Sequence, residues 1–376
     1  MGSRHERSMN AGRRRVLRGA LQLAAGSTVA AFAPGLSARA LAQGRGGRGG
    51  GDGAAAQTGT RLVLLGTQGG PNVNRRRNEA SSAVVVDGQP YLVDCGYGTL
   101  GALVESGVGY LQIGEVFLTH LHNDHTSDLP ALLSHQWTGS RAEPTVVYGP
   151  PGTARLVTAA VAFLEPDAEI RSVDEGRTVP PRTLYRGQDL PAGAPAQAFA
   201  DDRVKVTCVE NAHYEDRAKS LMPHRSVAYR FDTSSRSIVF SGDTAYSDGL
   251  VKLATGADLF VCEVMSVPFY ESMMAQAKAA AAKGNTNSVA RHIAETHVTT
   301  VDVGRMAAEA KVKTVVLTHI VPASRPGSTE LPDTVFIDGV RQHFSGQVIV
   351  GRDQMVLLSG IRDPGSGIRD TGSGIR

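Results

Sequence analysis

Cysteine is scarce in this chain, with only three among 376 residues. Cys95, Cys208 and Cys262 are odd in number and far apart, which excludes a disulfide framework and predicts buried thiols. A long hydrophobic run is also missing, because the apolar stretch 19–33 is too short and too rich in alanine and glycine to span a membrane. There is no long basic stripe either, which disfavours nucleic acid as a partner.

The first 42 residues resemble a twin-arginine export signal. Arg13 and Arg14 precede the apolar stretch, and a small-residue cleavage site ends at Ala42. Of the 39 basic and 36 acidic residues, seven and one lie in this segment, which leaves 32 and 35 and a formal charge of −3. We expect a folded, acidic protein that the twin-arginine machinery exports to the periplasm or another extracytoplasmic space.

Both ends flank one large domain. Residues 43–60 are rich in glycine, arginine and alanine and predict a flexible linker. Residues 361–376 continue a seven-residue repeat of Gly-Ile-Arg with too little apolar content to fold, so a disordered tail is expected. The remaining residues, 61–360, are enough for one domain with a sizeable core. The sequence leaves the oligomeric state open and is compatible with a homodimer.

Short β-rich runs alternate with helical patterns through this domain, strand-rich at first and then mixed α/β. The expected strands are 62–65, 83–86, 91–93, 116–118, 145–148, 204–209, 227–231, 237–240, 258–261, 314–317 and 348–350. The expected helices are 126–137, 152–164, 272–283, 301–310 and 333–344. The pattern predicts sheets covered by helices.

The densest chemical motif is His-Leu-His-Asn-Asp-His, directly after the apolar strand 116–118. His120 and His122 project to the same side because a strand alternates its side chains, and Asp124 and His125 join them only if the chain turns there. Imidazoles and a carboxylate suit zinc, iron or manganese. A solvated loop with Asp124 as a helix N-cap is the plainer alternative, but it leaves three clustered histidines without a role.

Three further candidate ligands follow predicted strands, where turns could aim them at this motif. They are His213, Asp243 in a Ser-Gly-Asp-Thr turn, and His319. Each alone is weak, since a lone aspartate usually forms a turn and a lone histidine usually packs. His224 competes with His213 as the third histidine, and we favour His213 because it directly follows the strand 204–209.

Taken in order, these motifs resemble the metallo-β-lactamase-fold hydrolases, in the branch of tRNase Z and the alkylsulfatase- and arylsulfatase-like enzymes. The motifs are Leu65-Gly66-Thr67, Asp94-Cys95-Gly96, residues 120–125, Tyr148-Gly149-Pro150, Ser241-Gly242-Asp243-Thr244 and Leu317-Thr318-His319. The resemblance implies an α/β fold, a four-layer αββα sandwich with metals at one edge. It also implies that a hydroxide bridging two divalent ions, expected to be zinc, attacks the substrate.

The same resemblance implies a ligand for each position. One metal would be held by His120, His122 and His213, and the other by Asp124, His125 and His319, with Asp243 bridging both. Asp124 would also orient the attacking hydroxide.

A further histidine, His297, matches a position from which members of this branch contact the scissile group, so it is a candidate general acid or oxyanion stabiliser. A structural histidine near a helix start is the alternative. Cys262 departs from the tRNA-processing pattern, in which histidine precedes the residue equivalent to Glu263. Three histidines lie in helical patterns away from any motif and are expected to be ordinary surface or packing residues, namely His135, His292 and His343.

The expected activity is hydrolysis of a small-molecule ester, with phosphodiesters first among substrates. Sulfate esters come second, lactams and lactones share the same chemistry, and tRNase Z-type RNA cleavage is disfavoured because residues 165–193, the only candidate arm for gripping RNA, mix both charge signs. The non-enzymatic alternative is a periplasmic metal-binding protein. An open bridging position argues for catalysis, since structural zinc sites are closed.

Overall fold

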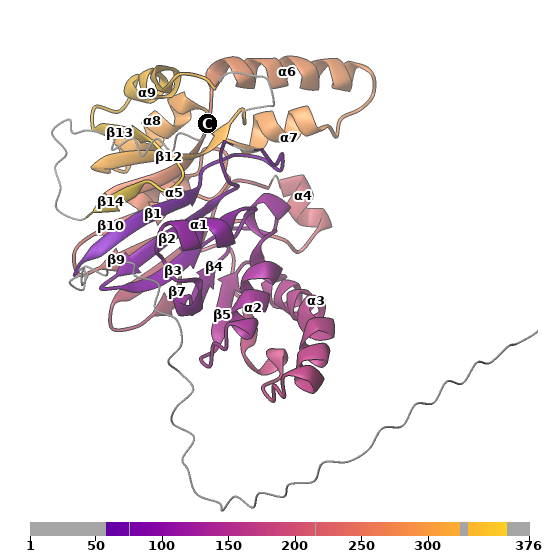
Figure 1. Ribbon diagram of the computed structural model, residues 1–376. Coiled ribbons are helices and arrows are strands. Elements are labelled where there is room, and N and C mark those ends of the chain that lie inside the picture. The colour runs from indigo at the N-terminus through magenta and orange to yellow at the C-terminus, as the bar shows by residue number, and fades with distance from the viewer. Residues whose placement is uncertain (1–57, 75, 215, 324–329, 359–376) are drawn as a thin grey trace, which may run out of the picture. The chain divides into compact units, whose positions relative to one another are not determined.

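Two seven-stranded sheets packed face to face form the body of the protein (Figure 1). The computed structural model describes residues 58–74, 76–214, 216–323 and 330–358. In spatial order, the first sheet contains β14 (Val356–Leu358), β1 (Thr60–Gly66), β2 (Ser81–Val86), β3 (Gln89–Val93), β4 (Glu115–Phe117), β5 (Thr145–Gly149) and β6 (Tyr185–Asp189). The second contains β13 (Gln347–Val350), β12 (Thr314–Val321), β11 (Leu259–Met265), β10 (Ser237–Phe240), β9 (Val227–Thr233), β8 (Val204–Glu210) and β7 (Ala196–Ala200).

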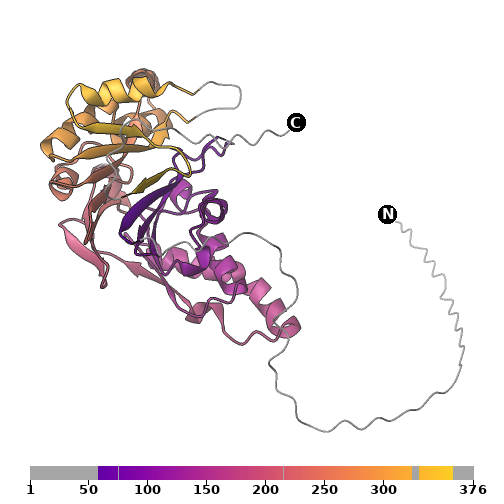
Figure 2. The ribbon, with the colours of Figure 1, turned by 60° about the vertical axis from the view of Figure 1, so that its left-hand side comes forward.

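Helices cover the outer face of each sheet (Figure 2). The first sheet carries α1 (Thr99–Glu105), α2 (Leu129–Thr138) and α3 (Thr153–Asp174), and the second carries α5 (Asp248–Ala254), α8 (Thr300–Glu309) and α9 (Asp333–Arg341). The remaining helices are α4 (Asp216–Leu221), α6 (Val267–Ala282) and α7 (Val289–Thr296), with short 3₁₀ turns η1 (Tyr110–Gln112), η2 (Asn123–His125) and η3 (Pro181–Thr183). The predicted four-layer αββα sandwich is confirmed.

The core between the sheets centres on Phe117. Its ring stacks on Tyr148 with 5.2 Å between centroids and meets Tyr229 and Phe231 edge to face at 5.7 and 5.2 Å. These aromatic pairs from both sheets stabilise the packing beyond the area they bury. Because both faces of each sheet are covered, β2 and β11 are buried at every position, and most of their residues are apolar.

Parallel pairing positions the functional loops. Strands β3 to β6 run parallel in the first sheet, and β10 to β13 run parallel in the second. The carboxyl ends of parallel strands share one edge of their sheet, so the loops after β3 and β4 lie together, as do those after β10 and β11.

Most predicted elements are present with shifted ends, but several differ. The helix expected over 126–137 begins at Leu129, because η2 and a turn follow the histidine motif. The helix expected to end at residue 164 continues as α3 to Asp174 and contains Pro166. Strands β6, β7 and β14 and the helices α1, α4, α5 and α7 were not predicted, and each is short or weakly apolar.

The predicted signal, most of the linker and the repeat tail lie outside the described residues, and β1 begins at Thr60, one residue before the expected start of the domain. No helix within the described ranges is both long and apolar enough to cross a membrane. All three cysteines are buried and free, as predicted.

Candidate metal centre

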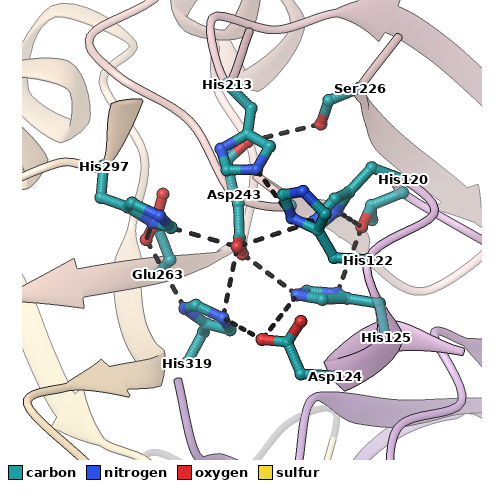
Figure 3. Close-up of polar contacts among 12 residues, drawn as sticks. His120, His122, Asp124, His125, His213, Ser226, Asp243, Glu263, His297 and His319 are labelled. Carbon is teal, nitrogen blue, oxygen red and sulfur yellow. Dashed lines mark hydrogen bonds and ion pairs between the residues drawn. The ribbon is translucent and has the colours of Figure 1, made fainter. Parts of the chain in front are cut away.

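The histidine motif lies on the loop after β4 and ends in a tight turn. His125 donates its backbone N–H to the carbonyl of His122 at 3.1 Å, which closes η2. This turn brings Asp124 and His125 back toward His120, as the convergence of these side chains requires (Figure 3). His120, Asp124 and His125 are buried, while His122 is partly exposed.

Asp243 reaches the site from the loop after β10. It follows Gly242, whose φ is +57°, and a Cβ added at Gly242 would lie 2.8 Å from the Cβ of Thr119. Only glycine therefore lets the β10 loop approach the β4 loop this closely. His213 enters from the loop directly after β8 and is also buried.

His319 lies inside β12, not after a strand as the sequence predicts. Thr318 pairs with Glu263 and Ile320 pairs with Val264, so His319 is the extra residue of a β-bulge. Its φ of +42° is unusual for a non-glycine residue. The bulge re-aims the imidazole into the site, where a regular strand would not place it (Figure 3).

Three imidazole nitrogens face one another at the first half of the centre. Nδ1 of His122 lies 3.0 Å from Nε2 of His120 and 3.2 Å from Nε2 of His213. A carboxylate oxygen of Asp243 lies 3.8 Å from Nε2 of His120. These four residues offer ligand atoms that all lie within 4.8 Å of one another.

The second half of the centre combines Asp124, His125, Asp243 and His319. Nε2 of His319 lies 3.4 Å from Asp124 and 3.3 Å from Asp243, and Nε2 of His125 lies 3.3 Å from Asp243. Asp243 belongs to both halves and stands between them (Figure 3). The geometry thus divides the seven residues into the two sets that the resemblance implies.

Partners outside the centre orient two of the imidazoles. His125 Nδ1 donates to Asp94 at 2.9 Å, and Asp94 also accepts the backbone N–H of Thr119 at 2.8 Å. His213 Nδ1 donates to the carbonyl of Thr296 at 3.3 Å. Each contact places the proton on Nδ1 and leaves Nε2 free to bind a metal.

The donor set fits divalent metal ions. Tetrahedral bonds of about 2.0–2.1 Å to nitrogen place ligand atoms roughly 3.3 Å apart, close to the spacing of the three imidazole nitrogens. Two buried atoms at the centre make no hydrogen bond to a described residue: Nε2 of His125 and Oδ1 of Asp243. Buried polar atoms are rarely left without a partner, and both of these atoms are suited to bind a cation.

Electrostatics support the same interpretation. Burial holds the pKa of His120 and His213 well below the ordinary value, which keeps both imidazoles neutral, as metal binding requires. Burial also opposes the charge on His319, but Asp243 and then Asp124 and Glu263 outweigh it and raise its pKa to about 10. The carboxylates therefore attract positive charge, which a metal would supply in place of protons.

His297 lies beside the centre and is paired. Its Nδ1 donates to Glu263 at 2.7 Å and lies 3.9 Å from Asp243. Burial alone would lower the pKa of His297, but the Glu263 carboxylate outweighs this effect and raises it. The backbone N–H of Thr244 donates to the other Glu263 oxygen, which fixes the carboxylate. The pair thus places a proton-bearing imidazole beside the candidate centre.

His292 is a neighbour of the candidate centre that sequence analysis missed. His135, His292 and His343 were all expected to be ordinary surface or packing residues, and His135 and His343 are indeed exposed. The ring of His292, however, lies 5.2 Å from that of His213 and 5.8 Å from that of His122. Burial lowers the pKa of His292 to about 4, so it is neutral. Its spacing of five residues before His297 was the only signal in the sequence.

The structure places only one of the two candidates for the third histidine ligand in the cluster. His213 lies within the cluster, whereas Nδ1 of His224 donates to the carbonyl of Pro151 at 3.3 Å. His213 was favoured because it directly follows the predicted strand 204–209, and its position in the cluster agrees with that choice. Metal binding by these residues stays a prediction.

A sequence profile described as "Beta-lactamase superfamily domain" matches residues 90–320, more than half of the chain. The chain belongs to this superfamily. The match contains all seven candidate ligands together with His297. The predicted resemblance to metallo-β-lactamase-fold, tRNase Z-like hydrolases is therefore confirmed.

Curated relatives and solved structures agree with this family. Ribonuclease Z of Mycolicibacterium gilvum is 31% identical over 72% of this chain and 87% of its own length. Ribonuclease Z of Mycobacterium bovis is 30% identical over 78% of this chain and 95% of its own length. The short form of human tRNase Z has a TM-score of 0.55 at 22% identity, with 80% of this chain and all of that chain covered.

The metallo-beta-lactamase fold protein YhfI from Bacillus subtilis also has a TM-score of 0.55, at 19% identity, with 80% of this chain and 99% of that chain covered. The two solved structures bear on the fold alone. Family membership and the buried histidine and aspartate clusters together identify a metal-dependent hydrolase with a divalent metal site.

Proposed function

We propose that this chain is an exported phosphodiesterase that uses two zinc ions to hydrolyse a small organic phosphodiester. The observation that carries the reaction class is the His297–Glu263 pair, placed against the two ligand sets that share Asp243. The relatives called ribonuclease Z support the same class by name, since a ribonuclease cleaves phosphodiester bonds.

The residues of the candidate centre can account for each step of this reaction. Two divalent ions would supply Lewis acidity and lower the pKa of a bound water toward neutrality. Burial opposes ionisation of Asp124, but His125 and His319 outweigh it and lower its pKa to about 2, so Asp124 can accept a hydrogen bond from the attacking water. His297, held by Glu263, donates a proton to the leaving alcohol oxygen.

The small substrate is inferred from the segment between β5 and β8. This segment holds no extended arm among the described residues: α3 buries Val157, Val161 and Leu164 against the first sheet. Residues 153–193 contain five arginines and six carboxylates, so the segment has no excess of positive charge for a phosphate backbone. A short ester without a long polyanionic tail fits this surface best.

RNA cleavage is the second candidate, and the names of the curated relatives favour it against the expectation from sequence. It shares the same metal centre and the same proton donor, so it differs only in what grips the substrate. Cleavage of a 3′-extended tRNA precursor at a rate above that of an aryl phosphodiester would establish this candidate in place of the small ester.

Export rests on residues 1–42, which lie outside the described part. Cell fractionation and N-terminal sequencing of the expressed protein test it, with Gln43 expected as the first residue of the exported form. Replacing Arg13 and Arg14 by lysine should retain the uncleaved chain in the cytoplasm. An exported, processed product of the double variant would contradict the twin-arginine route.

Turnover of an aryl phosphodiester tests the reaction class. The zinc-loaded protein should hydrolyse the diester faster than the matching aryl sulfate and phosphomonoester, and the His122→Ala variant should be inactive. A faster sulfate reaction would replace the proposal with an arylsulfatase. Tight binding of two metals without turnover of any of the three esters would contradict it and favour lactam, lactone or binding-only functions.

A further inference from the structure

A hollow of about 500 Å³ adjoins the candidate metal centre and is bordered by residues of α3 and by Met222, which directly follows α4. His122 and Tyr214 belong to its wall. The Tyr214 ring lies 5.8 Å from His122 and 4.8 Å from His213, so the hollow directly adjoins the candidate ligands. Its volume falls in the range of about 300–1,000 Å³ typical of small-molecule sites.

The wall is largely apolar. Leu156 and Ala159 project from one face of α3, and Leu121 lies beside His122. Met222, the residue directly after α4, also lines the hollow. Methionine and leucine side chains around a tyrosine ring form a surface suited to a flat apolar group. Gly152 also borders the hollow, and a Cβ there would lie 3.0 Å from both His224 and Leu121, so glycine preserves the open space.

One cation lies in this wall. Arg155 is exposed, and no ion pair joins it to a carboxylate among the described side chains. The start of α3 offers no second anion site, because Asp189 accepts the N–H groups of Gly152 and Ala154 at 3.2 and 2.8 Å. A negative group in the hollow would therefore be recognised by Arg155.

We infer that this hollow binds one ester arm of the substrate, an aromatic ring that carries an anionic substituent directed to Arg155. The inference rests on the proposed phosphodiesterase function and narrows it to aryl diesters with an acidic group. The scissile phosphate lies at the metals, and the ring extends past His122 and Tyr214 between Leu156 and Met222. No chemistry occurs in the hollow itself.

Three p-nitrophenyl phosphodiesters test this inference with the zinc-loaded full chain. They share the leaving group and differ in the second ester, which is methyl, phenyl or 4-carboxyphenyl. The kcat/KM should rise about tenfold or more from methyl to phenyl, and a further two- to fivefold, roughly the strength of an exposed ion pair, to carboxyphenyl.

Matched variants on α3 localise the preference. Ala159→Phe fills the hollow from an exposed position and should reduce the phenyl-to-methyl ratio of kcat/KM to near one. Ala162→Phe adds the same exposed ring three residues further on, outside the hollow, and should keep the ratio of the unmodified protein. Arg155→Gln should abolish only the advantage of carboxyphenyl over phenyl.

Binding of 4-carboxyphenylphosphonate, measured by calorimetry, separates this inference from the proposed function. If no diester turns over but Ala159→Phe weakens binding about tenfold and Ala162→Phe does not, the hollow is established and the phosphodiesterase is wrong. If diesters turn over with equal ratios in both variants, the phosphodiesterase stands and the hollow is not the arm site. Equal binding by both variants without turnover overturns both.

Discussion

Asp94 determines which nitrogen of His125 is free to bind a metal, and replacing it by asparagine tests this role. The carboxylate accepts from His125 Nδ1 at 2.9 Å and from the backbone and hydroxyl of Thr119 at 2.8 and 2.9 Å. In Asp94→Asn the amide oxygen can still serve Thr119, but the amide nitrogen would face His125 as a donor. The proton of His125 would then move to Nε2, the atom needed for the metal.

The expected loss follows from this tautomer change. Losing a partner that orients a metal-binding histidine typically costs about 10–100-fold in metal affinity, or roughly 1.4–2.8 kcal/mol. The metal held by His125 should weaken by this amount, while the metal held by His120 and His122 should be less affected. Titration with zinc against a competing chelator measures both affinities, and activity should recover at high zinc concentration.

Asp258→Asn is the matched control. Asp258 accepts the backbone N–H and hydroxyl of Ser237 at 2.7 and 3.1 Å and pairs with Lys313, at the opposite ends of β10 and β11 from the metal centre. It should lower stability without changing zinc affinity. Unchanged zinc affinity in Asp94→Asn, or an equal loss in both variants, would refute the tautomer argument.

Three further predictions concern the same centre. His213→Ala should lose one metal per chain by elemental analysis and His224→Ala should keep two; the reverse result would exchange their roles. Zinc binding near pH 7 should release protons from His125 and His319, because the surrounding carboxylates raise the pKa values of both histidines against the effect of burial. Zinc affinity should therefore rise with pH. Calorimetry in buffers of different ionisation enthalpy measures the release, and finding none would contradict this prediction. Glu263→Gln should lower kcat about a hundredfold and move the alkaline limb of the pH profile to lower pH, because His297 would lose the negative charge that raises its pKa. An unchanged profile would exclude His297 as the general acid.

The sequence was most informative where strand and motif adjoin. The apolar run before His120 and the one before Asp243 both form strands whose carboxyl ends meet at the site, so an apolar run followed by a polar turn located these ligands. The buried strands were predictable because a short, continuous β-branched run such as that of β2 is typical of a strand covered on both faces.

Features decided by tertiary contacts were not predictable. His319 enters the site through a bulge in β12, and no local pattern distinguishes a bulged strand from one that has ended. Asp94 belongs to a quoted motif, but its contact with His125 arises only when β3 and β4 pair. His292 looked like any helical histidine because the position of α7 relative to His213 depends on the packing of the whole second sheet.

The number and place of the metal ions test the central claim most directly. Crystals of the zinc-loaded protein, measured at the zinc absorption edge, should show two anomalous peaks on either side of Asp243, one against His120, His122 and His213 and the other against Asp124, His125 and His319. A single peak, or two peaks that do not share Asp243, would contradict the binuclear centre on which the proposed hydrolysis depends.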